Sequence, residues 1–205
     1  MTTSKHEALE ALQAEATACT RCPLYQHATS AVLYRGNPRA RVLLIGEAPG
    51  EGEDRLGKPF VGPAGRLLDR LGAEAGLVTD ADFFLTNVVM HHPPANRKPR
   101  AGELAACRPY WERLIEIVRP AILVLCGGTA LQAYFKKKLA ITRERGKWYP
   151  GPGYDIIAMY HPAYLLHVRQ HKPEAFDQLY GEVMTDLLAI KARLDAYWTG
   201  RNATA

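Results

Sequence analysis

Long apolar runs, internal repeats and low-complexity segments are absent from this 205-residue sequence. The longest apolar run, 121–135, is interrupted by Gly127 and Gly128 and falls short of the roughly 20 residues that a membrane-spanning helix needs. The first residues are polar and lack the apolar core and the small-residue cleavage site of a secretion signal. We therefore expect no membrane segment and a cytoplasmic location.

Cysteine is scarce, with four residues, and thiols inside a cell normally stay reduced. A disulfide scaffold is therefore the weaker explanation of these residues, and metal ligation or burial is the stronger one. Lys and Arg number 26 against 21 Asp and Glu, an excess that favours a polyanionic partner. The length and the 47% hydrophobic content predict a single globular domain over 1–198, followed by a frayed tail over 199–205.

Short apolar segments, each typical of a buried strand, alternate with helical patterns along the chain. Strands are expected at 41–45, 83–88, 121–125 and 155–159, and helices at 7–18, 63–76, 101–118, 127–138 and 174–196. Residues 145–159 read as one local hairpin. Because such alternation typically gives parallel strands covered on both faces, we predict an α/β fold: three α/β/α layers around a central, mainly parallel four-stranded sheet.

Functional side chains are expected after the strands, because ligands of open α/β sheets bind at the carboxyl ends. Glu47 lies in a Gly-rich turn after the first strand, Asn87 ends the second, and His161 follows the last. A carboxylate can orient water, a planar amide can read the edge of a base, and an imidazole can donate to an oxygen that gains negative charge. Phe60 could stack on an aromatic ring. Each residue alone is more often a turn, cap or core residue, whereas their convergence favours a ligand site.

Two distant segments carry residues of the metal-ligating types: Cys19, Cys22, His91, His92 and Cys107. By ligand type alone, a C-x-x-C pair with a third cysteine and a histidine fits a Cys₃His zinc site at least as well as an iron–sulfur cluster. The fourth cysteine, Cys126, continues an apolar strand. We expect it to be a buried small hydrophobe.

Positive charge is concentrated in two segments. Residues 136–147 contain six Lys and Arg residues and one Glu, and 97–100 reads Arg-Lys-Pro-Arg. DNA phosphates are a natural partner for such loops, although a solvated surface has much the same composition.

Several motifs are each weak alone: segments 46–50 with Glu53 and Asp54, 57–65, 86–88, 96–97 and 161–166. Together they resemble the family 4 uracil-DNA glycosylases, the iron–sulfur branch of the uracil glycosylase superfamily, over nearly the whole chain. The resemblance implies a three-layer α/β/α domain that flips uracil out of DNA and hydrolyses its N-glycosidic bond. An abasic site remains, and base excision repair begins there. Uracil-containing DNA is the implied partner, and a monomer is the default state.

The resemblance also implies roles for individual residues. Phe60 would stack on uracil, Asn87 would read its Watson–Crick edge, and His161 would stabilise negative charge at O2. Glu47 would be catalytic by positioning water, by stabilising the sugar cation or by helping to exclude the thymine methyl group. The other substrate-binding positions are Gly46, Ala48, Pro49 and Gly50, and the segment expected to contact DNA is Tyr164, Leu165, Leu166 and His167.

The family pattern has four cluster cysteines, the third just before a Pro-Pro step, and this chain has His91 at that place. The resemblance therefore implies a structural [4Fe–4S] cluster with the ligands Cys19, Cys22, His91 and Cys107, and with His92 as the alternative to His91. A neutral imidazole in place of a thiolate should raise the reduction potential. If neither histidine binds, the cluster has an open iron or is absent, and zinc becomes the stronger interpretation.

Some related uracil-binding proteins trap the sugar through a histidine in a Lys-Arg-Arg-Ile-His loop. The corresponding loop here, 94–100, contains no histidine, so we expect turnover. A non-turnover protein that binds or traps uracil-containing DNA is the alternative. From composition alone, a zinc-stabilised α/β protein with an unrelated nucleotide ligand is a third hypothesis.

Overall fold

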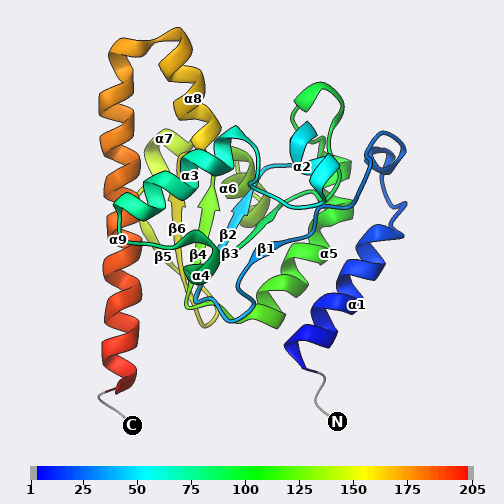
Figure 1. Cartoon of the computed structure of the whole chain (residues 1–205), viewed down its shortest axis with the longest axis horizontal. Coiled ribbons are helices and arrows are strands. Elements are labelled where there is room, and N and C mark those ends of the chain that lie inside the picture. The colour runs from blue at the N-terminus through cyan, green and yellow to red at the C-terminus, as the bar shows by residue number, and fades with distance from the viewer. Residues whose placement is uncertain (1–3, 203–205) are drawn as a thin grey trace.

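The computed structural model describes residues 4–202, and within them six strands form one sheet in the order β1-β3-β2-β4-β6-β5 (Figure 1). The strands are β1 (Arg35–Gly36), β2 (Val42–Gly46), β3 (Phe83–Asn87), β4 (Ile122–Cys126), β5 (Trp148–Pro150) and β6 (Asp155–Met159). The strands β3, β2, β4 and β6 are parallel neighbours, whereas β1 and β5 pair antiparallel at the two edges.

The four predicted strands are confirmed, but the prediction of a four-stranded sheet was wrong, because β1 and β5 extend it to six. These edge strands contain two and three residues, too few for the apolar alternation that marks a strand. The expected hairpin at 145–159 is formed by β5 and β6.

Helices cover both faces of the sheet, and all five predicted helices are present. They are α1 (Lys5–Thr17), α2 (Glu51–Leu56), α3 (Pro63–Glu74), α4 (Thr79–Asp82), α5 (Ala101–Val118), α6 (Gly128–Phe135), α7 (Ile141–Glu144), α8 (Pro162–His171) and α9 (Phe176–Asn202), with short 3-10 segments η1 (Pro23–Gln26), η2 (Pro94–Asn96) and η3 (Pro173–Ala175). The helix α9 includes 199–202, the first residues of the expected tail. Residues 203–205 of that tail lie outside the described part of the chain.

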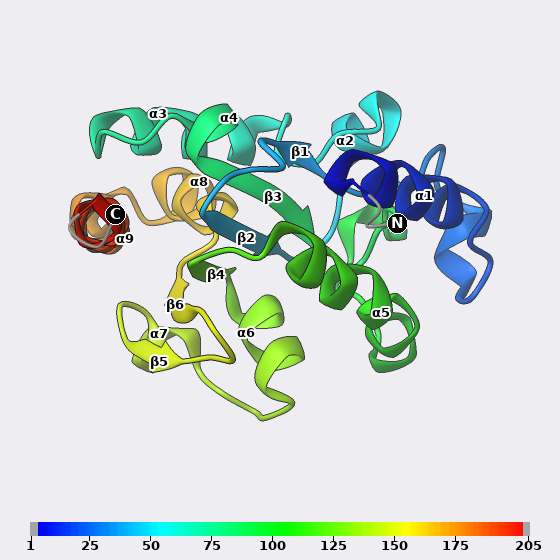
Figure 2. The ribbon, with the colours of Figure 1, turned by 90° about the horizontal axis from the view of Figure 1, so that it is seen from below.

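Alternate residues of each central strand face opposite helix layers. In β2, Leu43 and Ile45 belong to the apolar cluster with α1, α5 and α6, whereas Val42 and Leu44 belong to the cluster with α3, α8 and α9. Figure 2 shows α5 and α6 on one side of the sheet and α3 and α8 on the other. Because both faces are covered, the central strands are continuous apolar runs that end where the chain becomes polar.

The hairpin is anchored to α9 by a buried ion pair. Arg145 donates to the Asp186 carboxylate at 2.6 and 3.0 Å, and Asp186 is only 1% exposed. Lys147 pairs with Glu144 at 3.0 Å. Two of the six cations in the segment 136–147 are therefore paired with carboxylates of the chain. None of the helices in the described part of the chain has both the length and the apolar character needed to cross a bilayer.

Candidate active site

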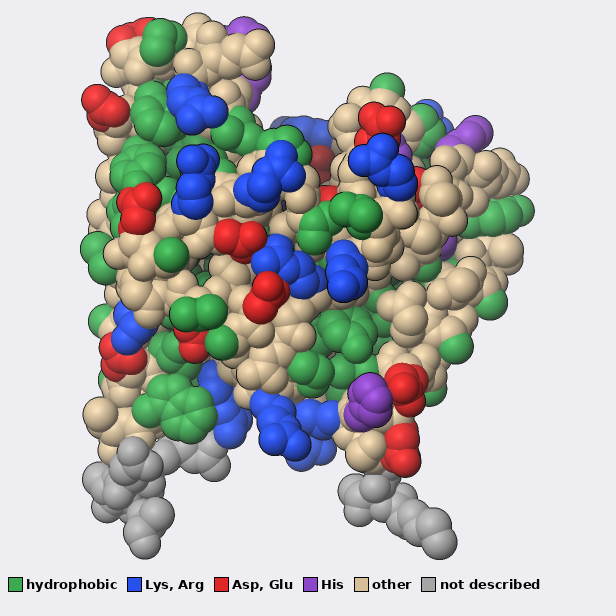
Figure 3. All heavy atoms as spheres, in the orientation of Figure 1, with side chains coloured by type: hydrophobic (Ala, Val, Ile, Leu, Met, Phe, Trp, Pro, Cys, Tyr) green, Lys and Arg blue, Asp and Glu red, His purple; other side chains and the backbone are tan. Residues whose placement is uncertain are grey.

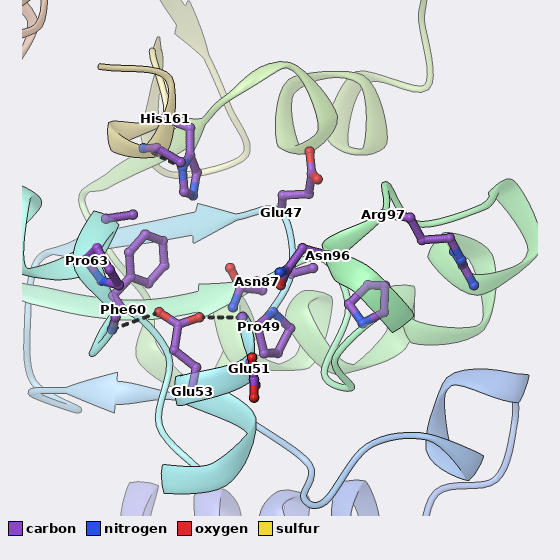
Figure 4. Close-up of a pocket in the computed structure, with 17 residues that line it drawn as sticks. Glu47, Pro49, Glu51, Glu53, Phe60, Pro63, Asn87, Asn96, Arg97 and His161 are labelled. Atoms are coloured by element: carbon purple, nitrogen blue, oxygen red, sulfur yellow. Dashed lines mark hydrogen bonds between the residues drawn. The ribbon is translucent and has the colours of Figure 1, made fainter. Parts of the chain in front are cut away.

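A cavity of about 570 Å³ opens at the carboxyl ends of the central strands (Figure 4). Seven of the predicted site residues line it: Glu47, Ala48, Pro49, Gly50, Phe60, Asn87 and His161. Gly46 lies behind its wall, where a Cβ atom would come within 2.5 Å of Asn87 Oδ1 and 2.6 Å of Phe60 Cζ. The fold therefore brings the predicted carboxylate, aromatic ring, amide and imidazole to one cavity, and the close packing at Gly46 leaves no space for a side chain.

Asn87 ends β3, where it is in register with Gly46 of β2. The residue is 1% exposed, and its Nδ2 has no hydrogen-bond partner among the described residues. Buried amide donors are normally satisfied. An unsatisfied donor in the cavity wall therefore indicates that a ligand supplies the acceptor.

Phe60 forms a wall of the cavity in a strained backbone conformation, with φ at 56°. Its carbonyl oxygen accepts a hydrogen bond from Arg35 Nη1 at 2.5 Å. Arg35 in turn pairs with Asp69 and Asp80. The Phe60 ring lies 5.8 Å from the His161 ring, with 30° between the planes. Strain of this kind persists only where neighbouring contacts hold it, and Arg35 supplies one of them.

His161 is the N-cap of α8, and its Nδ1 accepts a hydrogen bond from the Ala163 N–H at 3.2 Å. Burial lowers the pKa of His161 to about 4, so the imidazole is neutral at pH 7. Because Nδ1 acts as an acceptor, Nε2 carries the proton. The ring is thus a neutral donor at the edge of the cavity.

Glu47 follows β2 directly, and one of its carboxylate oxygens, Oε2, accepts a hydrogen bond from Thr129 Oγ1. Thr129 is the second residue of α6, which follows β4. Between that strand and helix, Gly127 has a φ of 95° and approaches the His161 side chain so closely that a Cβ atom would lie 3.1 Å from it. The turn after β4 therefore positions groups on both sides of the cavity.

Glu53 connects the two loops that form the site. Its carboxylate accepts from the Gly50 N–H at 2.9 Å and from the Gly62 N–H at 3.5 Å, as the dashed lines in Figure 4 mark. The residue is 9% exposed. It ties the loop after β2 to the loop that carries Phe60, and so fixes the width of the cavity between them.

The η2 segment closes another side of the cavity with two residues in the left-handed region: Ala95 at φ 54° and Asn96 at φ 53°. Asn96 Oδ1 lies 2.9 Å from His92 Nε2. Arg97 holds the segment through a bidentate pair with the buried Glu103 carboxylate, at 2.6 and 2.8 Å. Asn96 and Arg97 both line the cavity.

Sequence reasoning gave no role to Arg35, Glu53 or Thr129. For Thr129 a signal existed, because it follows β4 at the same rim as Glu47 and Asn87 and the strand-end rule applies equally to it. Glu53 was visible only as part of a motif. Arg35 acts on Phe60 from 25 residues away, and no local pattern marks it.

The segment expected to contact DNA lies on α8, beside the cavity. Tyr164 is 45% exposed, His167 is exposed and stacks on His171 with ring centroids 4.3 Å apart, and Leu166 is half-buried. Leu165 is fully buried in the core with α3 and α9. The helical period turns the Leu165 side chain inward, whereas Tyr164 and His167 face outward; the DNA contact of this segment stays a prediction.

Three of the predicted metal ligands lie near one another. Cys19 and Cys107 are both near enough to affect the pKa of Cys22, and burial raises the pKa of Cys107 to about 12. His91 is 5% exposed, and burial lowers its pKa. Within residues 4–202, however, no three Cys, His, Asp or Glu side chains form a group that could hold a metal ion. Neither the zinc site nor a complete set of cluster ligands is therefore formed.

Cys126 is fully buried, and its thiol lies 3.8 Å from the Tyr160 carbonyl oxygen, to which it donates. Burial raises its pKa, so the thiol is inert. The prediction that it is a buried small hydrophobe is confirmed.

An α/β protein whose strand ends carry an unsatisfied amide, an aromatic wall, a neutral imidazole donor and a carboxylate has the parts of a nucleobase-binding site. The sequence pattern of the Uracil DNA glycosylase superfamily matches residues 33–183, and the chain belongs to that superfamily. It is 39% identical to the type-4 uracil-DNA glycosylase of Thermotoga maritima, over 82% of this chain and 88% of the relative. The type-4 enzyme of Saccharolobus solfataricus is 42% identical, over 78% and 77%. The type-5 enzyme of Thermus thermophilus is 37% identical, over 62% and 66%.

Proposed function

We propose that this protein is a uracil-DNA glycosylase that starts base excision repair by hydrolysing the bond between uracil and deoxyribose. Membership of the superfamily and the similarity to type-4 enzymes support this function. The observation that carries it is the buried Asn87 amide, whose Nδ2 has no partner within residues 4–202. Uracil presents an acceptor at O4 beside a donor at N3, which complements one donor and one acceptor of an amide plane.

In the proposed complex, uracil leaves the DNA stack and lies with one face on Phe60. Asn87 Nδ2 donates to O4, while Asn87 Oδ1 accepts from the N3–H. His161 Nε2 donates to O2. Cytosine carries a donor at the position of O4, so the same amide arrangement disfavours it. Close contacts on a flipped base give selectivity that cannot be obtained within the duplex.

Bond cleavage needs opposite charges to be stabilised on the two fragments. The C1′–N1 bond breaks with its electron pair passing to uracil, and the His161 donor stabilises the negative charge that reaches O2. The oxygen of a water molecule forms the new bond to C1′. Glu47, oriented by Thr129, holds that water and accepts its proton. A neutral donor suits this task, because its attraction for uracil grows as the base becomes an anion.

The decisive experiment uses an end-labelled oligonucleotide with one uracil, beside a thymine control, incubated with substoichiometric and with excess protein. We expect many alkali-labile breaks per protein molecule, only at uracil. The variant His161→Ala should lose most of this activity, whereas the exposed His27→Ala should keep it. Retention of DNA without abasic product, or a protein–DNA band that resists denaturation, would contradict turnover and favour binding or trapping.

We also propose that the protein carries a structural [4Fe–4S] cluster with ligands Cys19, Cys22, His91 and Cys107. The similarity to type-4 relatives and the nearness of the three thiols support this proposal. His92 is the weaker candidate, because its Nε2 already lies 2.9 Å from Asn96 Oδ1. The cluster would cross-link α5 to the segments 19–22 and 91 and would take no part in the hydrolysis. Since the donors do not form a closed set, binding must draw them together.

Iron analysis and visible absorption test the cluster. We expect about four iron atoms per chain in protein that is purified without oxygen. His91→Ala should lose nearly all of this iron, whereas His91→Cys should retain it. His92→Ala is the matched control and should keep its iron. Stoichiometric zinc without iron would contradict the proposal.

We further propose that the protein acts as a cytoplasmic monomer. The residues that line the cavity come from one chain, so the proposed chemistry needs no second subunit. Sedimentation at working concentrations tests the oligomeric state.

A further inference from the structure

A second cavity, of about 1110 Å³, lies where the central strands begin, at the opposite end of the sheet from the active site. Arg41 precedes β2, Arg119 precedes β4 and Tyr154 precedes β6, while Trp111 of α5 and Tyr134 of α6 form its aromatic side. We call this cavity the basal groove. Figure 3 shows Lys and Arg side chains gathered at this lower end of the molecule.

Two lining residues of the groove, Arg41 and Arg119, have further cations beside them, Lys5 and Arg39. Lys5 donates to the Val118 carbonyl oxygen at 2.6 Å, and its pKa is lowered by burial and by repulsion from Arg41, Arg119 and Arg39. In the described part of the chain, none of these three arginines has an ion pair with a carboxylate. Four neighbouring cations without a carboxylate attract an anionic partner.

Two buried donors at the groove also lack acceptors. Trp111 is 2% exposed, and its Nε1 has no hydrogen-bond partner among the described residues. The Nε atom of Arg41 is likewise buried without one. Arg41 lies over the rings of Tyr197 and Trp198, at 5.4 and 5.7 Å. Unsatisfied buried donors are costly and rare, and carbonyl or carboxylate oxygens of a ligand would satisfy them.

The remaining wall is aromatic and carries carboxylates. The hydroxyl groups of Tyr134 and Tyr154 lie 2.9 Å apart, and Glu112 pairs with Arg108 at 2.6 Å. Glu116 is exposed at the same wall and has no ion pair with a described residue. A nucleic-acid strand carries a phosphate at every nucleotide, so a strand along the groove would place phosphates beside these carboxylates. A peptide with acidic residues at one end and an apolar side chain at the other avoids that repulsion.

We propose that the basal groove binds an acidic peptide segment of a partner protein, with the carboxylates at the Arg39, Arg41 and Arg119 end and an apolar anchor against Trp111 and Tyr154. This function is independent of uracil excision, because the two cavities lie at opposite ends of the sheet. A partner bound there would leave the active site open to DNA.

Fluorescence anisotropy tests the proposal with the full chain and a fluorescein-labelled peptide of four aspartates followed by phenylalanine. The comparison peptide has asparagine in place of aspartate. We expect Arg39→Glu and Arg119→Glu each to weaken binding of the acidic peptide by about tenfold or more. The asparagine peptide should bind the unmodified protein about as weakly as the acidic peptide binds these variants. The matched control Arg70→Glu, an exposed change on α3, should bind within about twofold of the unmodified protein.

Three outcomes would overturn the proposal. The asparagine peptide binds as tightly as the acidic one, or both charge reversals leave binding unchanged, or a labelled oligothymidylate binds more tightly than the peptide and loses affinity in Arg39→Glu and Arg119→Glu. The last result would assign the groove to nucleic acid. Because Arg39 is exposed, its reversal should not disturb folding, and unchanged uracil excision by that variant verifies an intact protein.

Discussion

Replacing Asn87 with alanine should separate recognition of uracil from folding. In the proposed complex the variant loses two hydrogen bonds to a buried amide, at about 1.5 kcal/mol each. The sum, about 3 kcal/mol, corresponds to a fall in kcat/KM of about 150-fold. Folding should respond differently, since Nδ2 of Asn87 has no partner to lose in the part of the chain that the structure describes. Removal of an unsatisfied donor offsets the lost packing, so the free energy of unfolding should change by no more than about 1 kcal/mol.

Single-turnover and steady-state excision from a uracil oligonucleotide measure kcat/KM, and urea unfolding measures the free energy of unfolding. Gln178→Ala on the exposed face of α9 is the control, because it removes an amide whose Nε2 donates to the exposed Glu182 side chain. A loss of activity below about fivefold would refute the proposed contacts. A fall of more than about 3 kcal/mol in the free energy of unfolding would show that the amide serves the fold.

Three further predictions follow from the site. Thr129→Val should lower kcat about 10- to 100-fold with little change in KM. Thr129→Ser keeps the hydroxyl that orients Glu47, so its kcat should stay within about threefold of the unmodified protein. Equal losses of kcat in both variants would contradict this role. Ala95→Gly should raise the free energy of unfolding by about 0.5–1 kcal/mol, since Ala95 has φ at 54° and glycine adopts that region without strain; a decrease in urea melts would exclude strain there. The pKa of His161 is lowered to about 4, so between pH 6.5 and 4 the unfolded chain binds a proton that the folded chain does not. The free energy of unfolding should therefore decrease as the pH is lowered from 6.5 to 4. In urea titrations, His161→Asn should show a flatter dependence on pH.

Much of the fold was predictable from the local pattern of apolar residues. Apolar runs of five residues, separated by amphipathic stretches, mark strands buried on both faces, and strand polarity then assigns the residues after them to one rim. Glu47, Asn87 and His161 were found in this way, and all three line the cavity. The edge strands escaped prediction because two or three residues carry no period. The burial of Leu165 was not predicted, because the motif gives a segment, whereas burial depends on which face of α8 packs inward.

The sequence by itself therefore determined the strand pattern, the end of the sheet at which the site lies and the residue types available to it. Only the tertiary structure decided how those side chains are held. Thr129 reaches Glu47 across 82 residues, and Arg35 reaches the Phe60 carbonyl across 25. Arg145 was counted as a surface cation, but its partner Asp186 lies 41 residues away in α9. The Asn87 amide is unsatisfied because the surrounding walls bury it without an acceptor. Strand and helix periods arise from neighbouring residues along the chain, whereas burial and hydrogen-bond satisfaction depend on segments that meet only after the chain has folded.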